Sequence, residues 1–144
     1  MNKQMDSSSY QALVAEERNN EITLSLQRKI TRPLQAGEAA VRVQYSSLNY
    51  KDALAAVKGS QVVSSYPIVP GIDLAGTVTE SKDSRYREGE CVLVTGYGLG
   101  VSHDGGLSEQ AFVPGDWIVP LPDGMSLEEA MVIGTAGFTA ALSI

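Results

Sequence analysis

The two residue types most typical of zinc sites, cysteine and histidine, are scarce in this chain. Cysteine and histidine occur once each, as Cys91 and His103, twelve positions apart. A zinc site needs three or four cysteine, histidine or carboxylate ligands in a tetrahedral arrangement. One thiol and one imidazole supply neither a catalytic zinc site nor a structural site of four cysteines. We therefore expect these 144 residues to hold no zinc.

The segment LNYKD carries side chains with a different chemistry. Asn49, Tyr50 and Asp52 place an amide, a phenol and a carboxylate within four residues. A phenol is neutral at pH 7 and becomes a stabilised anion, which makes it suitable as a proton donor. The alternative is structural: Asn49 caps a helix and Tyr50 packs its ring against the fold. The capping role and a site role for Asn49 are compatible.

Short β-strands are expected to position these residues. In the run 22–29, Ile22, Leu24 and Leu26 alternate with polar residues, which is typical of a half-buried strand. A break at Asn19-Asn20 separates this run from the one before it. The segments that favour strands are 10–17, 22–29, 39–46, 73–80, 92–95, 107–113 and 117–121.

Two helices are expected beside these strands. One to two turns begin in LNYKDALAAVKG and end at Gly59. Ser126 and Glu129 form a capping box that opens a second helix, and the helical pattern resumes after Gly134-Thr135. Short strands with frequent glycine and proline turns predict a mainly β (α+β) domain built as a compact barrel.

Composition excludes several classes of function. The net charge is −6 and the eleven lysines and arginines are scattered, which argues against a nucleic-acid-binding protein. No apolar stretch approaches the ~20 residues of a membrane span, and the first residues lack the apolar core of a secretory signal. We expect a cytoplasmic protein with a flexible tail over residues 1–9 and with Cys91 buried as a small apolar residue.

Five blocks, in order, resemble the medium-chain dehydrogenase/reductase superfamily: SSLNYKD, YPIVPGIDLAGTV, REGECVLVTG, GGLSEQAFVPGDWIVPLP and EEAMVIGTAGFTAAL. NYKDA, PGIDLAGTV and IGTAGFTA are similar to its zinc-free subgroup of quinone oxidoreductases and acryloyl-CoA reductases. The resemblance implies a GroES-like, partly open β-barrel over residues 10–130. The start of a linker helix, 131–144, would then lead to a Rossmann domain. No GxGxxG motif follows a strand, so we expect that domain to be absent from this chain.

The resemblance also implies roles for the polar residues. The LNYKD loop replaces the loop that carries a zinc-binding cysteine in the related alcohol dehydrogenases. The family's Gly-His-Glu is replaced by Gly71-Ile72-Asp73, which removes a histidine ligand. Tyr50 would lie beside the nicotinamide as proton donor, with Asn49 and Asp52 as its neighbours.

Residues of the second helix are expected to reach the cofactor. Thr135 and Thr139 would run along the cleft, where a threonine hydroxyl meets the nicotinamide carboxamide; the alternative for both is helix packing alone. The absent domain would hold most of the NADPH.

Other polar residues have weaker expected roles. Tyr97 would line the substrate pocket or simply pack, and Lys51 would meet a phosphate or remain solvated. Asp73 is expected to hold the site loop by hydrogen bonds. His103 is expected to be an exposed turn residue in a glycine-rich loop.

The function implied is an NADPH-dependent reductase that transfers hydride to an activated C=C bond. An acryloyl-CoA-like thioester is the first substrate expected, and a quinone or enone the second. The alternative is a non-catalytic GroES-like module that binds a ligand or partner. Full-length relatives imply a homodimer. In this chain, exposed Phe138, Leu142 and Ile144 are expected either to self-associate or to order the helix against the barrel.

Overall fold

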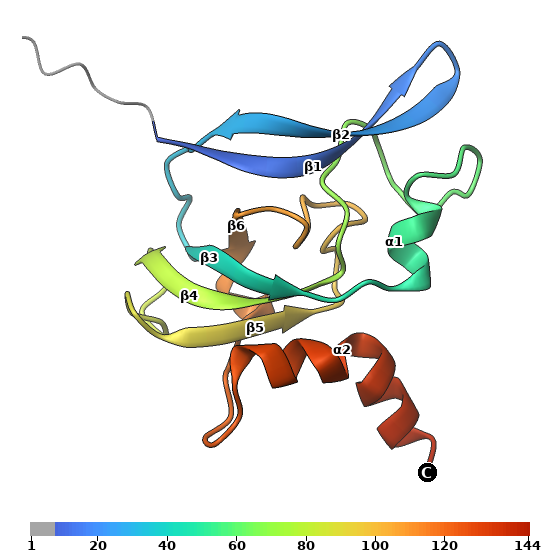
Figure 1. Ribbon diagram of the computed structural model, residues 1–144. Coiled ribbons are helices and arrows are strands. Elements are labelled where there is room, and N and C mark those ends of the chain that lie inside the picture. The colour runs from blue at the N-terminus through green and yellow to red at the C-terminus, as the bar shows by residue number, and fades with distance from the viewer. Residues whose placement is uncertain (1–7) are drawn as a thin grey trace, which may run out of the picture.

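The computed structural model describes residues 8–144, whose strands form two separate sheets (Figure 1). The smaller sheet is an antiparallel hairpin of β1 (Ser9–Arg18) and β2 (Glu21–Ile30). Asn19 and Asn20 join the two strands, with φ angles of 50° and 69°. Two consecutive positive φ angles match the twist of a tight hairpin, and asparagine tolerates them. The break predicted there is confirmed, whereas most of the predicted tail lies outside the described residues.

The larger sheet has five strands in the order β6-β3-β4-β5-β7, and every neighbouring pair is antiparallel. The bounds are β3 (Glu38–Ser46), β4 (Asp73–Ser81), β5 (Cys91–Thr95), β6 (Gln110–Pro114) and β7 (Val119–Pro120). A 3-10 turn, Gly115–Trp117, precedes β7. The register places Asp73 at the start of β4 directly opposite Thr95 at the end of β5.

The main core lies on the face of the larger sheet that is turned toward the hairpin in Figure 1. Its largest fully buried side chains include Leu74, Leu99, Val41, Val78, Val92, Val94 and Val113. The hairpin is attached by backbone hydrogen bonds, from Leu13 N to Leu107 O at 2.9 Å and from Ala15 N to Ile68 O at 2.8 Å. The two sheets do not close into one continuous barrel. The predicted mainly β, partly open barrel is confirmed.

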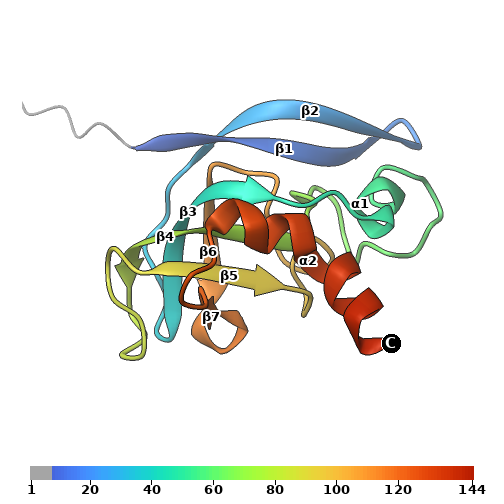
Figure 2. The same cartoon turned by 60° about the horizontal axis from the view of Figure 1, so that its bottom comes forward.

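Two helices flank the larger sheet. The short α1 (Tyr50–Leu54) lies at one end of β3, and α2 (Leu127–Leu142) covers the sheet face opposite the main core (Figures 1 and 2). Ala130 and Met131 of α2 pack on Ala75 of β4. The helix α1 ends earlier than predicted, because the chain continues in turns up to Gly59, whose φ is 77°. Within residues 8–144, neither helix is long and apolar enough to cross a membrane.

The structure confirms the two features predicted for α2. The Ser126 hydroxyl accepts a hydrogen bond from Glu129 N at 3.1 Å, and the Glu129 carboxylate accepts one from Ser126 N at 2.8 Å. This reciprocal pair satisfies backbone donors at the helix start. Gly134 interrupts the helix with φ 50° and ψ −164°, so α2 consists of two segments.

Two predictions about burial are wrong. The apolar face of β2 is not half-buried: Leu24 is 46% exposed and Leu26 is 73% exposed. Alternation predicts which residues share a face, but burial also requires a covering layer, and this face lies on the outside of the hairpin. Cys91 is exposed rather than buried. The alternation along β5 turns Val92 and Val94 inward and Cys91 outward.

Candidate functional site

The start of α1 is held by a buried carboxylate. Asp52, only 7% exposed, accepts hydrogen bonds from the backbone N–H groups of Asn49 at 2.8 Å, Gly71 at 3.1 Å and Ile72 at 3.0 Å. Asp52 therefore ties the loop before α1 to the turn before β4. The side chain of Asn49 makes no bond to the helix, although Asn49 occupies its N-cap position.

The amide of Asn49 is directed instead toward Asp73, the first residue of β4. Asn49 Nδ2 donates to Asp73 Oδ2 at 3.0 Å. The same oxygen accepts a bond from Thr135 N at 2.9 Å, and Asp73 Oδ1 accepts one from the Thr135 hydroxyl at 2.5 Å. Asp73 is fully buried, with 0% of its surface exposed. Three segments far apart in the sequence therefore meet at one carboxylate.

A second bond joins the same loop to α2. The Ser47 hydroxyl donates to the carbonyl of Met131 at 2.6 Å. Met131 lies in the last turn before the interruption at Gly134. Its carbonyl therefore does not receive the N–H of the residue four positions later, as it would in a continuous helix. Ser47 satisfies this carbonyl and fixes the first segment of α2 against the loop.

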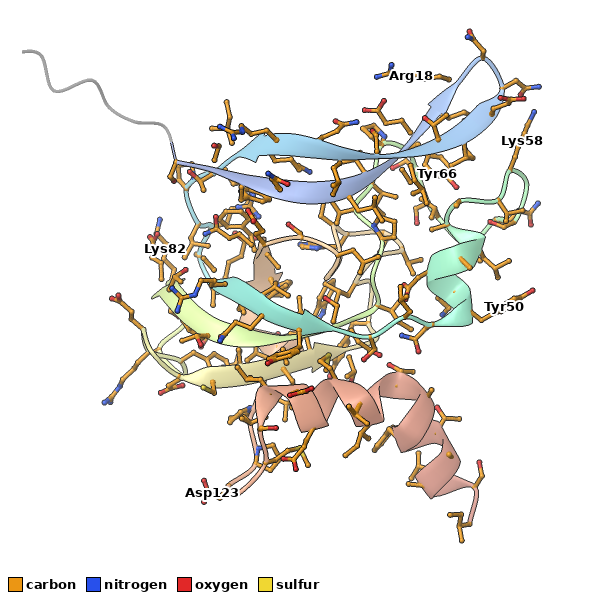
Figure 3. The ribbon with its side chains drawn as sticks, viewed as in Figure 1. Arg18, Tyr50, Lys58, Tyr66, Lys82 and Asp123 are labelled. Carbon is orange, nitrogen blue, oxygen red and sulfur yellow. The ribbon has the colours of Figure 1, made fainter. Side chains whose placement is uncertain are left out.

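Tyr50 follows this network directly but points away from it. Its side chain is 80% exposed and projects from the first turn of α1 away from the body of the protein (Figure 3). Leu48 on the other side of Asn49 is 83% exposed, and Lys51 is also exposed. The polar residues of the loop are thus divided: Asn49 and Asp52 face the protein, and Tyr50 faces outward.

Thr139 lies one turn beyond Thr135 on α2. Its hydroxyl donates to the carbonyl of Thr135 at 2.9 Å, and the residue is exposed. This bond within the helix leaves the lone pairs of the Thr139 oxygen on the helix surface.

Tyr97 belongs to a neighbouring aromatic cluster that shares no hydrogen bond with the Asp73 network. Its ring stacks on Trp117 with the centroids 5.6 Å apart and the planes 5° from parallel. Tyr97 is 68% exposed and has φ 54°, a left-handed backbone that is unusual for a residue other than glycine. His103 meets the edge of Trp117 at 5.2 Å, and one of its ring nitrogens pairs with Asp104 O at 2.8 Å.

The aromatic cluster is connected to the hydrogen-bond network of Asp73 by residues that precede Tyr97 in the chain. Thr95, which pairs with Asp73, lies two residues before Tyr97, and Gly96 N bonds to Ile72 O at 3.0 Å. Sequence reasoning missed Trp117, although it is the only tryptophan of the chain. Its role as the backing of Tyr97 depends on a contact between distant turns.

A small cavity of about 130 Å³ lies beside the interruption of α2. Its lining combines the outer face of β5 with α2 and comprises Leu93, Thr95, Met125, Ala130, Ile133, Gly134 and Phe138. The apolar lining suits part of a ligand rather than a charged group.

A second cavity, of about 300 Å³, lies elsewhere and includes the cations Lys29 and Arg32. Both cations are already paired: Lys29 with Asp104 at 2.5 Å and Arg32 with Glu38 at 2.8 Å. Burial raises the pKa of Tyr10 at this cavity above its ordinary value. Because its charges are compensated internally, we do not place the functional site there.

Residues that could hold a metal ion are not gathered in the part of the chain that the structure describes. No group of three or more histidine, cysteine, aspartate or glutamate side chains forms a possible coordination site among residues 8–144. Asp52 and Asp73 instead accept protein hydrogen bonds. The arrangement is therefore suited to fixing a loop beside an exposed phenol.

The sequence and fold of this chain are similar to those of a known domain family and of several relatives. The profile of the alcohol dehydrogenase GroES-like domain matches residues 35–123. The chain is 53% identical over 135 residues to YhfP of Bacillus subtilis (strain 168), whose name assigns it provisionally to the quinone oxidoreductases. It is 51% identical over 111 residues to acrylyl-CoA reductase AcuI of Ruegeria pomeroyi, covering 77% of this chain.

Solved structures agree with these sequence comparisons. The crystal structure of YhfP with NAD bound matches 95% of this chain with a TM-score of 0.90. That of the yhdH oxidoreductase from Salmonella enterica, in complex with NADP, matches 92% of it with 51% identity and a TM-score of 0.86. This chain spans 41% of the length of YhfP and 34% of that of AcuI.

Proposed function

This chain belongs to the family of alcohol dehydrogenase GroES-like domains, within the medium-chain dehydrogenase/reductase superfamily, and we propose that it forms the substrate-side half of an NADPH-dependent reductase. The observation that carries the proposal is the meeting of Asn49, Asp73 and Thr135 beside the exposed phenol of Tyr50. The NADP in the yhdH structure supports the choice of cofactor. Residues 131–144 then begin the linker to a nucleotide-binding half that holds most of the cofactor.

The substrate is an activated alkene conjugated to a carbonyl group. The name of AcuI favours an acryloyl-CoA-like thioester, and that of YhfP supports a quinone or enone as the second class. When bound, NADPH would supply a hydride to the β-carbon of such a substrate. Negative charge then develops on the carbonyl oxygen, where hydrogen-bond donors stabilise it.

Tyr50 supplies the proton in this proposal. Its phenol is exposed at the first turn of α1, so it can reach a substrate lying outside the barrel. Asn49 and Asp52, expected as neighbours in the site, are positioning residues in this proposal. The amide of Asn49 and the carboxylate of Asp52 already form hydrogen bonds with other groups of the protein. They hold Tyr50 in place instead of touching the substrate.

Thr135 contacts the carboxamide of the nicotinamide in this proposal, and Thr139 lies next along the same surface. The Thr135 hydroxyl gives its hydrogen to Asp73 and retains lone pairs that fit an amide N–H donor. Tyr97, backed by Trp117, forms a flat wall of the substrate pocket. Lys51 meets a phosphate of a CoA substrate from the same turn as Tyr50.

The proposed chemistry uses no zinc. The support is the ligand count of the sequence and the replacement of Gly-His-Glu by Gly71-Ile72-Asp73. Asp73, the third residue of that motif, is buried and bonded to protein groups. Metal analysis of the purified protein should therefore find no stoichiometric zinc; one zinc per chain would contradict this part of the proposal.

A non-catalytic binding module is the alternative. The deciding experiment uses the full-length gene product that carries this chain and follows NADPH absorbance with acryloyl-CoA, benzoquinone and an enone in turn. We expect NADPH oxidation with one equivalent of reduced product, and weak NADPH binding by the 144-residue chain alone. Absence of NADPH oxidation with all three substrates would favour the module. Tight NADPH binding by the 144 residues alone would contradict the assignment of the cofactor to a second half.

A further inference from the structure

Asp73 occupies the position of a helix cap, although it belongs to a strand. At Gly134 the backbone leaves the helical region, so the second segment of α2 begins with free N–H groups. Asp73 Oδ2 accepts the N–H of Thr135, the first residue after the interruption, at 2.9 Å. A carboxylate at a helix start is favoured by the helix dipole as well as by the hydrogen bond. The start of the second segment is therefore fixed to β4.

Gly134 permits this close approach. A Cβ atom at Gly134 would come within 2.7 Å of Ser47 Oγ and 2.9 Å of Asp73 Oδ2. These distances are shorter than ordinary van der Waals contacts, and the conformation with φ 50° and ψ −164° is close to one that only glycine adopts readily. The interruption of α2 thus brings its backbone onto the carboxylate.

The same carboxylate sets the direction of two hydrogen bonds. Asp73 is acceptor-only when ionised, so the Thr135 hydroxyl must give it its hydrogen across the 2.5 Å contact. The lone pairs of Thr135 Oγ1 then point away from Asp73, toward any ligand on this surface. Asn49 Nδ2 donates to the other oxygen of Asp73. This bond holds the LNYKD segment, residues 48–52, which carries Tyr50 and is called the Tyr50 loop below.

We propose that Asp73 is a positioning residue that holds the Tyr50 loop in register with α2 and orients the Thr135 hydroxyl as an acceptor for a primary amide on the cofactor. This inference rests on the proposed function, in which a nicotinamide lies at Thr135. The carboxamide NH2 of the nicotinamide is the donor that such a hydroxyl would select.

Asp73→Asn tests the direction of the hydrogen bond between residue 73 and the Thr135 hydroxyl while keeping a side chain of the same shape. The amide oxygen can still accept from Asn49 and Thr135 N if the NH2 group takes the place of Oδ1 and donates to the Thr135 hydroxyl. The hydroxyl hydrogen would then point outward and face the carboxamide NH2. Thr135→Val removes the hydroxyl altogether, and Thr135→Ser retains it.

The readout is cofactor binding to the full-length gene product, measured with NADPH and with its 3-acetylpyridine analogue, which has a methyl ketone in place of the amide. We expect the unaltered protein to bind NADPH about five- to ten-fold more tightly than the analogue, the ratio of one hydrogen bond. Thr135→Ser should keep this ratio, whereas Asp73→Asn and Thr135→Val should bring it close to one. Thr77→Val, which removes the exposed hydroxyl bonded to Gln44, is the matched control and should not change it.

Two results separate failure of this inference from failure of the proposed function. If Asp73→Asn or Thr135→Val discriminates between the two cofactors as the unaltered protein does, the orientation by Asp73 is wrong while the reductase proposal stands. If the unaltered protein neither binds nor oxidises NADPH, both fail. If Asp73→Asn does not fold, Thr135→Val still overturns the inference when it discriminates between the two cofactors as the unaltered protein does, because it keeps the carboxylate and the backbone bond to Thr135 N.

Discussion

The hydroxyl of Thr135 lies 2.5 Å from the carboxylate of Asp73, 62 positions earlier in the chain. Asp73 is fully buried, yet among residues 8–144 no lysine, arginine or histidine forms an ion pair with it. Its partners are an amide, a hydroxyl and the N–H at the start of a helical segment. Charge-assisted hydrogen bonds of this kind are about twice as strong as neutral ones. Asp73 thus joins β4, the Tyr50 loop and α2 without a cation.

Replacing Tyr50 with phenylalanine should abolish most of the reductase activity. Loss of a general acid lowers kcat by about 10² to 10⁴, and because Tyr50 is 80% exposed, the fold should be unaffected. Steady-state NADPH oxidation by the full-length gene product measures this, with KM expected to change little. Tyr45→Phe, at another exposed tyrosine on β3, is the control. A Tyr50→Phe variant with more than half the normal kcat would exclude the phenol as proton donor.

Asp52 should make a large contribution to stability, because its buried carboxylate accepts three backbone N–H groups. Asp52→Ala leaves the N–H groups of Gly71 and Ile72 buried without an acceptor, and it also removes the bond to Asn49 N. Each unsatisfied buried donor costs about 1–3 kcal/mol, so the free energy of unfolding should fall by about 3 kcal/mol or more.

Urea unfolding of the 144-residue chain measures the effect of Asp52→Ala. The stability of Asp52→Asn should lie between that of the unaltered chain and that of Asp52→Ala. Its amide oxygen still accepts from Gly71 and Ile72, whereas its NH2 group faces Asn49 N. Asp123→Ala, in an exposed turn, should change stability by less than about 0.5 kcal/mol. A loss below about 1 kcal/mol for Asp52→Ala would show that the turn does not depend on this carboxylate.

Local chemistry made much of the fold predictable. Paired asparagines marked the hairpin turn, Ser126 and Glu129 marked the start of α2, and Gly134 marked its interruption. Each signal acts over a few residues, so the sequence contains all the information needed. The mainly β class follows in the same way from alternating strands and closely spaced turns.

Contacts between residues far apart in the sequence were harder to predict. The hydrogen bonds of Asp73 depend on the antiparallel register of β4 and on how α2 crosses the sheet. The local sequence pattern predicts neither of these arrangements. The stacking of Tyr97 on Trp117 depends on two turns 20 residues apart. Alternation in β2 predicted a burial that the covering layers do not provide, as the exposed Leu26 shows.

Acid should weaken the turn that Asp83 and Arg85 form. The Arg85 guanidinium, through its hydrogen bonds, lowers the pKa of Asp83 to about 2 from its ordinary value of 3.8. The unfolded chain therefore binds more protons than the folded chain between these two values. The stability contributed by the pair is present above about pH 4 and is lost as the pH falls toward 2.

An NMR titration of the Asp83 carboxyl measures this directly. Arg85→Ala should return the pKa of Asp83 toward 3.8 and remove its share of the acid dependence of unfolding. Arg87→Ala, a neighbouring exposed arginine, should leave the titration unchanged. An unaltered protein in which Asp83 titrates near 3.8 would show that the pair does not persist in solution.

The second segment of α2 should cause the 144-residue chain to self-associate. Phe138 is 61% exposed, Leu142 is 73% exposed and Ile144 is fully exposed, all on a segment with little cover. Sedimentation velocity over a range of concentrations should show dimers that Phe138→Ser combined with Leu142→Ser converts to monomers. Leu26→Ser, on the exposed face of the hairpin, should leave association unchanged. A monomer at all concentrations would mean that this apolar surface is too small to drive association.

Gly134 and Gly137 offer a matched pair of substitutions within α2. Alanine at Gly134 must adopt φ 50° and places a Cβ against Ser47 and Asp73, so it should cost about 2–3 kcal/mol of stability. Alanine at Gly137 meets only Ile133 Cγ2 at 3.0 Å, a tight contact that a shift of a few tenths of an ångström by this half-exposed side chain relieves. Gly137 occupies an ordinary helical position. Removing a helical glycine is worth about 0.5–1 kcal/mol, so Gly137→Ala should be neutral or stabilising.

The two variants also differ in their effect on the Asp73 network. In Gly134→Ala the Cβ displaces the carboxylate, so the amide proton of Thr135 should exchange with solvent faster, because its acceptor Asp73 Oδ2 has moved. In Gly137→Ala that exchange should be as slow as in the unaltered chain. Urea unfolding and amide hydrogen exchange of the 144-residue chain give both readouts. Equal destabilisation by the two alanines would show that Gly134 serves only as a helix breaker, without holding α2 against Asp73.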